Sequence, residues 1–291
     1  MRIVIAGASG NIGSRIVNNL LNRGEAPVMI ARNADKVSKF VARGATFVQA
    51  ASDDAEKILV ATRNADALFW MTPPVLEQSS LKGWYARTAA IAAQAIAING
   101  IKRVVHISSI GAGARPGLGT VSYTGDVEVM LANESAHLIN LRPGYFMQNL
   151  ANALPRLYSD AVLELPFLPD HDIPWISTDD IGDVATAYLI DQEWAGKWAR
   201  NLMGPENVTP RQIAEIMSDI LKKTVHYRQV TLQQIDDDLA KLGANTTVRA
   251  EMNMLMQALG DADGIYATSR TPDAVTPTTL RGFLANVLKT P

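Results

Sequence analysis

The sequence predicts an α/β protein whose core is a doubly wound parallel sheet, followed by a smaller C-terminal α+β lobe, and three observations support this. The chain starts with an apolar run, Ile3 to Ala6, that passes directly into the spacing Gly7-x-x-Gly10-x-x-Gly13. Apolar residues then recur at helical spacing, at Ile12, Ile16, Val17, Leu20 and Leu21. Short apolar runs continue to alternate with helical patterns up to about residue 150. Strands that alternate with helices form a parallel sheet with right-handed crossovers.

Each of the three glycines has its own role at this turn. Gly7 lets the backbone turn sharply off the strand, Gly10 leaves room for a pyrophosphate, and Gly13 lets the helix pack closely on the strand. The free N–H groups of Asn11, Ile12 and Gly13 then face an anion at the positive end of the helix dipole. The strand before the glycines and the amphipathic helix after them favour a dinucleotide site of the Rossmann type over an ordinary strand-to-helix turn.

Composition narrows the classes of function. The chain has 291 residues, 47% of them hydrophobic, which allows one large α/β domain or a domain with a small second lobe. The formal net charge is −2 and the basic residues are scattered, so neither nucleic acid nor an anionic membrane is indicated as a partner. There is no cysteine, which excludes disulfides, thiolate metal sites and cysteine nucleophiles, so any redox chemistry must come from a cofactor.

The first residues and the hydropathy bear on localisation. The predicted core strand starts almost at once, with no cleavable signal before it, and no apolar run approaches the ~18 residues that a membrane span needs. We therefore expect a cytoplasmic enzyme that acts on a small molecule. The sequence leaves open a homodimer.

The second predicted strand, Pro27 to Ala31, brings Arg32 to the position where a site that prefers NAD presents Asp or Glu to the ribose hydroxyls. No acid is present there. Arg32 can stack on the adenine and pair with a 2′-phosphate, and Lys36, one helical turn further on, can add a second charge. The alternative is that both are solvated residues at the start of the next helix. The missing acid favours NADP(H) over NAD(H).

The third strand is predicted at Thr46 to Gln49, with a short helix from Asp54 to Ala61 behind it. Asp53 or Asp54 could accept a hydrogen bond from the adenine amino group. An Asp directly before a helix is more often its N-cap, and this interpretation is favoured.

The fourth strand, Ala67 to Met71, ends at Thr72-Pro73-Pro74, because proline cannot continue a central strand. The chain must leave the sheet there, at the carboxyl edge where doubly wound folds bind ligands. We expect Thr72 and Pro73 to line the cofactor.

Leu81 to Ile98 is predicted as a long helix that ends at Gly100, before a fifth strand from Arg103 to Ile107. Ser108 and Ser109 follow that strand. The glycine-flanked elbow of a serine hydrolase is absent, so Ser108 is expected to contact the nicotinamide or the substrate.

A helix from Asp126 to Asn133 and a sixth strand from His137 to Leu141 complete the dinucleotide-binding domain, 1–150. Residues 151–291 are expected to form mainly the substrate-binding lobe, with 174–203 returning to the first domain. Pro155 to Pro174 contains four prolines and the charged group around His171, which suits a loop-rich lid that contacts substrate.

The rest of the chain carries clear start signals for helices. The expected elements are a helix opened by Asp179, Asp180 and Asp183, a short strand near Asn201, a helix N-capped by Thr209 with Pro210 at its first position, a strand at Val225–Gln229, and helices at Leu232–Leu242, Val248–Leu259 and Thr278–Leu288.

Seven short motifs occur in one order along nearly the whole chain. They are G-A-S-G-N-I-G, A-R-N-A-D-K, T-P-P, V-V-H-I-S-S, L-R-P-G-Y-F-M-Q-N-L, S-T-D-D-I-G-D-V-A and G-P-E-N-V-T. With these motifs the chain resembles the NmrA-like branch of the atypical short-chain dehydrogenase/reductase superfamily.

The resemblance implies a Rossmann domain with a smaller C-terminal substrate lobe, and substrate in the cleft over the nicotinamide. Members include quinone, dye and phenylpropanoid reductases, and also proteins that bind the dinucleotide as a signal without turning it over. The resemblance further implies that NADP(H) is held by Gly7, Ser9, Gly10, Asn11, Ile12, Gly13 and Arg32.

The chain departs from the pattern of its relatives at the catalytic helix. Typical short-chain dehydrogenases use Tyr-x-x-x-Lys, in which the lysine lowers the pKa of the tyrosine so that the phenol can exchange a proton. Tyr123 is followed four residues on by Val127, and no lysine occurs between Lys102 and Lys197. The single lysine of isoflavone-type reductases is missing too, near Thr124. Tyr123 is either an unaided proton donor or a packing residue.

Two further classes of site find little support. The acid that relatives often place after the third strand is replaced by Ala50-Ala51-Ser52, so the sequence does not predict which residue contacts the adenine. The histidines His106, His137, His171 and His226 lie in separate elements without the i, i+4 spacing of metal ligands. We predict no metal, and His106, inside a strand, is expected to be structural.

Our first hypothesis is therefore an NADPH-dependent oxidoreductase that transfers hydride directly to a flat, easily reduced molecule such as a quinone, dye, enone or aromatic natural product. Tyr145, at the cofactor, and Phe146, Asn149 and the Pro155 to Pro174 lid would shape the pocket. The rival is a non-catalytic NADP(H)-sensing regulatory protein, which the missing lysine motivates. A third interpretation is a natural-product pathway enzyme that uses the fold for other chemistry.

Overall fold

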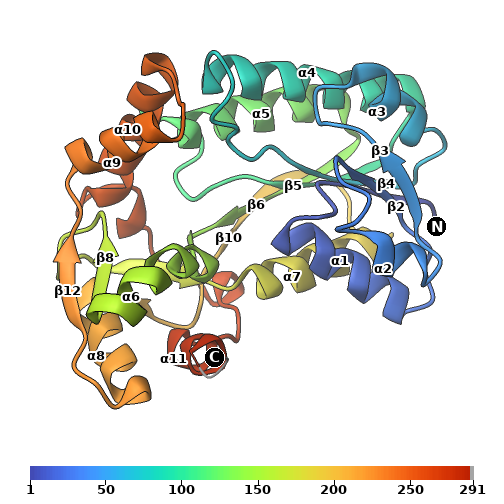
Figure 1. Ribbon diagram of the computed structural model, residues 1–291. Helices are drawn as coiled ribbons and strands as arrows, with labels where there is room; N and C mark the ends of the chain where they lie inside the picture. The colour runs from blue at the N-terminus through green and yellow to red at the C-terminus, as the bar shows by residue number, and fades with distance from the viewer. Residues whose placement is uncertain (289–291) are drawn as a thin grey trace.

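The computed structural model, which describes residues 1–288, has a central parallel sheet of seven strands (Figure 1). The strand order is β10-β6-β5-β4-β1-β2-β3, so the chain reverses direction across the sheet between β1 and β4. The strands are β1 Ile3–Ala6, β2 Val28–Ala31, β3 Thr46–Gln49, β4 Ala67–Met71, β5 Arg103–Ile107, β6 His137–Pro143 and β10 Lys197–Leu202. The predicted α/β, doubly wound fold is confirmed.

Helices cover both faces of this sheet, as Figure 1 shows. On one face lie α1 Asn11–Asn22, α2 Ser38–Val41 and α7 Thr178–Ile190, whose apolar residues pack with β1, β4 and β5. On the other lie α3 Ala55–Ala61, α4 Leu81–Asn99 and α5 Thr120–Glu134. Because both faces are covered, β1 and β2 are buried along their whole length, which explains why they consist of continuous apolar runs.

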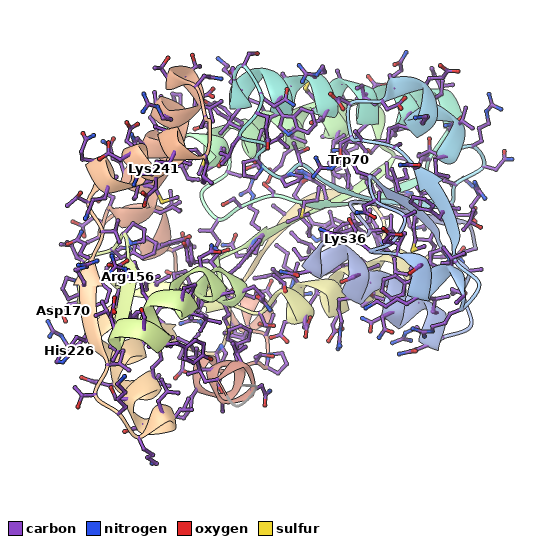
Figure 2. All side chains as sticks on the ribbon, in the orientation of Figure 1. Lys36, Trp70, Arg156, Asp170, His226 and Lys241 are labelled. Atoms are coloured by element: carbon purple, nitrogen blue, oxygen red, sulfur yellow. The ribbon has the colours of Figure 1, made fainter. Side chains whose placement is uncertain are left out.

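The smaller lobe has its own hydrophobic core, in which Phe167 and Trp175 are fully buried. Its helical elements are η1 Met147–Ala153, α6 Leu154–Asp160, α8 Pro210–Leu221, α9 Leu232–Lys241, α10 Thr246–Gly260, η2 Ile265–Ala267, η3 Pro272–Ala274 and α11 Leu280–Val287. Two short sheets complete it, β11-β9-β7 and β12-β8, from β7 Tyr145–Phe146, β8 Val162–Leu165, β9 Ile173–Ile176, β11 Asn207–Val208 and β12 His226–Gln229. Figure 2 labels Arg156, Asp170, His226 and Lys241 on this lobe and Lys36 and Trp70 on the Rossmann domain.

The elements differ from the predicted ones in three places. The short strand expected near Asn201 is the seventh strand of the main sheet, since Lys197 to Leu202 pairs with Leu138 to Pro143. The helix expected from Asp126 begins at Thr120, because Gly119 takes a left-handed conformation, with φ of 58°, directly before it. The segment expected as a loop-rich lid contains α6 and β8, and β8 is tied into the lobe by its pairing with β12.

The predicted start signals at two helices are confirmed. Asp54 caps α3 by accepting a hydrogen bond from the Lys57 N–H, which favours the N-cap interpretation over an adenine contact. Thr209 caps α8 in a capping box with Gln212, and Pro210 occupies the first helical position. Across residues 1–288, no helix is both long and apolar enough to cross a membrane.

Candidate functional site

The glycine loop has the geometry of a pyrophosphate cradle. Gly7 has a φ of 70°, which only glycine adopts without strain, and the Gly10 N–H closes the turn by donating to the Gly7 carbonyl over 3.0 Å. Gly10 is the N-cap of α1, and no side chain caps that helix. The first N–H groups of α1 are therefore left to an anion, in contrast to α4, α7, α8, α9 and α10, which side chains cap.

The space around Gly10 and Gly13 separates their roles. A Cβ on Gly13 would lie 2.4 Å from the Gly7 carbonyl oxygen and 2.9 Å from the Ala8 Cα, so this glycine serves the close packing of α1 on the turn. A Cβ on Gly10 would meet only the Gly7 oxygen, at 3.4 Å. The region in front of Gly10 is thus open and of the right kind for a pyrophosphate, and the residues present fit a dinucleotide. Ser9 lies in the same turn.

The end of β2 presents two unpaired cations. Arg32 and Lys36 are exposed, and neither side chain forms a hydrogen bond or ion pair with any residue in 1–288. The Arg32 carbonyl accepts a hydrogen bond from the Gln49 side chain over 3.1 Å, which ties the end of β2 to β3. The guanidinium of Arg32 is thus available to a phosphate.

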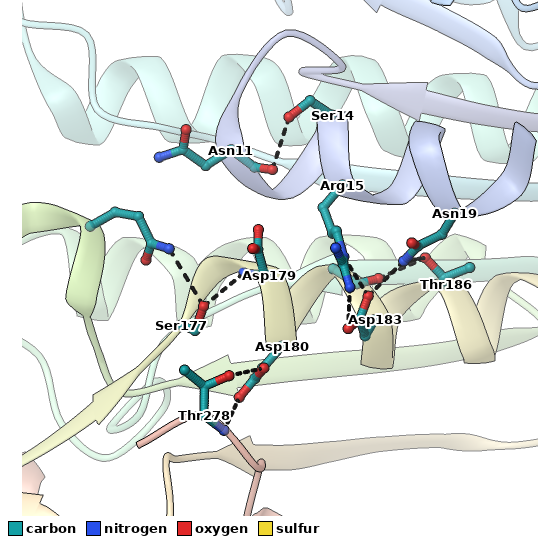
Figure 3. Close-up of polar contacts among 12 residues, drawn as sticks. Asn11, Ser14, Arg15, Asn19, Ser177, Asp179, Asp180, Asp183, Thr186 and Thr278 are labelled. Carbon is teal, nitrogen blue, oxygen red and sulfur yellow. Dashed lines mark hydrogen bonds and ion pairs between the residues drawn. The ribbon is translucent and has the colours of Figure 1, made fainter. Parts of the chain in front are cut away.

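Helix α7 lies beside α1 on the same face of the sheet and fixes its position (Figure 3). Asp183 accepts two hydrogen bonds from Arg15, at 2.7 and 2.8 Å, and one from Asn19 at 2.7 Å. Gly182 brings the helices this close, because a Cβ there would lie 2.6 Å from Arg15 Cγ. Burial opposes ionisation of Asp183, but the hydrogen bonds from Arg15 and Asn19 outweigh it and lower its pKa. The glycine loop is therefore carried on a helix with a fixed position.

A cleft of about 610 Å³ opens at the carboxyl edge of the sheet, between the two lobes. Thr72 and Pro73 after β4, Ser108 and Ser109 after β5, and the segment from Gly144 after β6 form its floor. Its other lining residues come from α4 and α5, from η1 and from the small-lobe elements α9, α10 and η2. The structure thus brings together six predicted site residues that lie far apart in the sequence, namely Thr72, Pro73, Ser108, Tyr145, Phe146 and Asn149.

No charged side chain lines this cleft among residues 1–288. Its polar groups are hydroxyls and amides, and the Ser108 hydroxyl is buried without a hydrogen-bond partner in that part of the chain. A buried hydroxyl without a partner costs free energy unless a ligand satisfies it, so Ser108 is a natural contact for a bound molecule.

Three tyrosines are the only titratable side chains that line the cleft in the described chain. Burial raises the pKa of Tyr145 to about 12, against a smaller opposing effect of Asn149, and its ring packs edge-on against Phe167 and Trp175. Burial also raises the pKa of Tyr85 and of Tyr266. All three phenols are therefore protonated and neutral near pH 7, able to donate hydrogen bonds to a ligand.

Tyr123 lies outside the lining of the cleft. Its hydroxyl donates to Glu251 Oε1 over 3.2 Å, and its ring packs edge-on against Tyr85. Burial and the neighbouring Glu251 carboxylate raise the pKa of Tyr123 to about 12. The residues of this helix that line the cleft are Thr120, Val121 and Thr124.

His171 is also not among the residues that line the cleft, and its role as a substrate contact stays a prediction. Its ring is buried between Phe167 and Tyr266, and Nε2 lies 2.9 Å from the Leu259 carbonyl. His106 is fully buried in β5, where Nδ1 contacts Asn140 Oδ1 at 2.9 Å and burial lowers its pKa. Both imidazoles lie in packed positions.

Sequence reasoning missed the cleft residues that come from helices. Tyr85 belongs to the apolar face of α4, where nothing in the spacing separates a cleft residue from a core residue. Met252, Leu255 and Met256 belong to the apolar face of α10 for the same reason. Glu251 carried a usable signal, because a carboxylate on the apolar face of a helix between Val248 and Met252 needs a specific partner.

No cluster of His, Cys, Asp or Glu that could hold a metal ion occurs in residues 1–288.

Comparison with known proteins gives one family and several relatives of almost full length. The sequence model of the NmrA-like family matches residues 1–284. An NAD(P)H azoreductase from Xenophilus azovorans is 28% identical over 290 residues, which cover 97% of this chain and 95% of the relative.

Two solved structures show the same fold at lower identity. An NADPH-dependent quinone oxidoreductase from Escherichia coli, in complex with NADPH, superimposes with a TM-score of 0.81 at 21% identity, covering 99% of this chain and all of the other. A triphenylmethane reductase from Citrobacter sp., in complex with NADP(H), gives a TM-score of 0.76 at 17% identity, over 98% and 99% of the two chains.

Proposed function

The chain belongs to the NmrA-like family, and from this premise we propose that it is an NADP(H)-dependent reductase of a flat, uncharged acceptor. The observation that carries the proposal is that two features occur together in this molecule. An uncapped glycine loop at the N-terminus of α1 suits a pyrophosphate, and an apolar cleft without charged side chains lies at the carboxyl ends of β4, β5 and β6. The azoreductase relative, named for an NAD(P)H-dependent reaction, supports the same class of reaction.

The preference for NADP(H) over NAD(H) rests on β2. Arg32 and Lys36 are exposed and unpaired in the described chain, and the residue directly after the strand is Arg32 rather than an acid that would accept from ribose hydroxyls. A guanidinium can hold a 2′-phosphate with two parallel hydrogen bonds. A carboxylate at this position would repel that phosphate.

When bound, the dinucleotide supplies a hydride. The residues of this chain bind, orient and exclude water: Gly7 to Gly13 hold the pyrophosphate, Ser108 and Tyr145 offer hydroxyls at the end of the cleft nearest the sheet, and Phe146 packs against the acceptor. Reduction of a quinone or an azo bond also requires protons. Burial raises the pKa of Tyr145 and of Tyr85 and makes both weaker acids. We therefore expect the anion that hydride transfer leaves on a strong acceptor to be protonated afterwards by bulk solvent and its buffer, so that catalysis relies on proximity.

The lining of the cleft argues for an uncharged acceptor. A sulfonate or carboxylate enclosed there would lose its hydration without gaining a counter-ion. For an ion in a protein interior this loss costs on the order of several kcal/mol. A neutral quinone or azo compound of the same shape carries no such cost.

The rival function is a dinucleotide sensor without turnover. It is favoured by the absence, from the described cleft lining, of any side chain that titrates near neutral pH. Strong hydride acceptors need little acid assistance. The missing acid therefore restricts the substrates to such acceptors more than it argues against catalysis.

The test follows NADPH oxidation by its absorbance across quinones, dyes and enones. It includes one matched pair, 1-phenylazo-2-naphthol and its para-sulfonate, which share a chromophore and differ by one charge. We expect turnover of neutral acceptors and a kcat/KM at least about tenfold lower for the sulfonate. Tight NADPH binding without turnover of any acceptor would favour the sensor, and equal rates for the pair would overturn charge selection.

A further inference from the structure

We propose that Glu251 is a positioning residue that holds the α10 side of the acceptor cleft against the Rossmann domain. The proposal rests on the proposed function, since it takes the cleft lined by Thr72, Ser108, Tyr145 and α10 as the acceptor site. Its observation is different: a buried carboxylate from the small lobe accepts four hydrogen bonds from two helices of the other domain.

The Glu251 clasp consists of Glu251 and its four donors. Oε2 accepts from the Leu81 N–H at 2.6 Å, and Oε1 accepts from the Lys82 N–H and the Ser80 hydroxyl, both at 3.0 Å. The Tyr123 hydroxyl, from α5, adds a fourth contact at 3.2 Å to Oε1. Glu251 is 6% exposed and Leu81 is fully buried, so water reaches this group poorly.

The clasp completes the N-terminus of α4. The first N–H groups of any helix have no partner within the helix, and here Ser80 accepts from Gly83 while Glu251 takes Leu81 and Lys82. Negative charge is also favoured at this end of a helix. Movement of α10 away from α4 would therefore leave two N–H groups and a carboxylate without partners, which gives α10 one preferred position.

The position of α10 determines the shape of the cleft. Met252, Leu255 and Met256 follow Glu251 on the same helix and line the cleft directly. Figure 1 shows α9 and α10 beside the end of α5. Contact there is close, because a Cβ on Gly119 would lie 2.7 Å from the Glu251 carbonyl oxygen and 2.7 Å from the Leu255 nitrogen.

This arrangement gives Tyr123 a role other than proton donation. Its hydroxyl points to Glu251 and is absent from the cleft lining, so it links α5 to the same carboxylate that binds α4. Loss of the hydroxyl should therefore loosen the acceptor site rather than slow the chemical step.

The experiment compares Glu251→Ala, Glu251→Gln and Tyr123→Phe with the wild-type protein, on an acceptor that the wild type reduces. We expect Glu251→Ala to raise the KM for the acceptor about tenfold or more while kcat falls less than about threefold, since four hydrogen bonds to a charge are lost far from the reacting atoms. Glu251→Gln keeps one acceptor oxygen and should give an intermediate KM. Tyr123→Phe should raise KM by about twofold to fivefold. NADPH affinity should stay unchanged in all three.

A matched control removes a carboxylate from the same helical pair without touching the other domain. Asp238 on α9 is exposed, and within residues 1–288 its side chain pairs only with Lys241, three residues further along the sequence, so Asp238→Asn should leave KM unchanged. Hydrogen exchange supplies a readout that needs no turnover: the amides of Leu81 and Lys82 should exchange at least about tenfold faster in Glu251→Ala and Glu251→Gln than in the wild type.

Several outcomes would overturn the proposal. They are an unchanged KM and unchanged exchange at α4 in the Glu251 variants, an equal loss of NADPH and acceptor affinity, or a hundredfold loss of kcat in Tyr123→Phe at constant KM. If Glu251→Ala does not fold, Glu251→Gln and Tyr123→Phe carry the same measurements. If the wild type reduces nothing, the proposed function fails, while the exchange measurement still decides whether the clasp exists.

Discussion

At the scale of single residues, Gly10 and Gly13 belong to one motif but serve different purposes, space for the cofactor at Gly10 and close helix packing at Gly13. We predict that Gly10→Val abolishes NADPH binding in a protein that remains folded. Gly10 has a φ of −81° and an open space in front of it, so valine fits the backbone but its branches fill the place of the pyrophosphate. NADPH fluorescence titration and circular dichroism measure the two properties.

Gly13→Ala is the comparison, because its Cβ would lie 2.4 Å from the Gly7 oxygen and should lower the melting temperature instead. A folded Gly10→Val variant with normal NADPH affinity would contradict the cradle.

Arg32 permits a prediction on cofactor choice. Arg32→Ala should weaken the binding of NADPH by about tenfold to a hundredfold and leave the binding of NADH nearly unchanged. The loss corresponds to roughly 1.4 to 3 kcal/mol, as expected for a charge-assisted phosphate contact. Arg43→Ala is a suitable control, since the Arg43 side chain already binds Asn18 and Asn22 on α1. Titration of both cofactors gives the answer, and equal losses for the two would remove the phosphate role.

At the scale of elements, the contact between α1 and α7 makes stability depend on pH. Because the pKa of Asp183 is lowered in the folded state, its contribution is present above the unfolded value of about 4 and is lost as the pH falls through the folded value. We predict that Asp183→Asn lowers the melting temperature at pH 7 by the equivalent of about 1 kcal/mol or less, since the pair is partly exposed to solvent.

The difference between Asp183→Asn and the wild type should shrink as the pH is lowered below about 4, the unfolded value, and calorimetry at pH 7 and at a series of lower pH values can show this. Asp179→Asn, on the same helix, controls for the general effect of charge. A difference that persists at low pH would mean that packing of α1 on α7, rather than the carboxylate, is responsible.

The elements also show how far sequence reasoning reaches. Strands with both faces covered and helices with start signals were predicted nearly to the residue, because the apolar runs and caps act locally. The start of α5 depends on the conformation of Gly119, and the order within 155–174 depends on pairing with β12. Both are decided by contacts with residues far along the chain, which spacing does not encode.

The residues of the candidate site also fall into those that local sequence predicts and those that depend on distant contacts. Residues that follow strands, such as Thr72, Ser108 and Phe146, could be placed at the cleft, because all carboxyl ends of a parallel sheet meet at one edge. Tyr85 and Met252 could not, since the way a helix face is shared between core and cleft depends on how the lobes meet. Tyr123 remains a prediction as a proton donor, and its contact with Glu251 gives the alternative.

At the scale of the whole molecule, the cleft determines how turnover responds to pH. Its titratable side chains within the described residues are tyrosines that burial keeps protonated, Tyr145 with a pKa of about 12. We predict that kcat for an acceptor that does not itself titrate varies less than about threefold between about pH 6 and about pH 9. Steady-state kinetics in overlapping buffers tests this, with the acceptor alone as the control for uncatalysed reduction. A bell-shaped profile or a sharp step within that range would reveal an acid or base that the cleft lining lacks.

The strand β10 has a consequence for how the protein is made. It forms the edge of the main sheet beside β6, yet more than fifty residues, which include small-lobe elements and helix α7, are synthesised between the two. On the ribosome the Rossmann sheet therefore stays open at β6 until Leu202 has left the exit tunnel, and the partly made chain carries an unpaired strand edge during that interval. We expect a chaperone that recognises unpaired strand edges to bind this chain mainly during that interval.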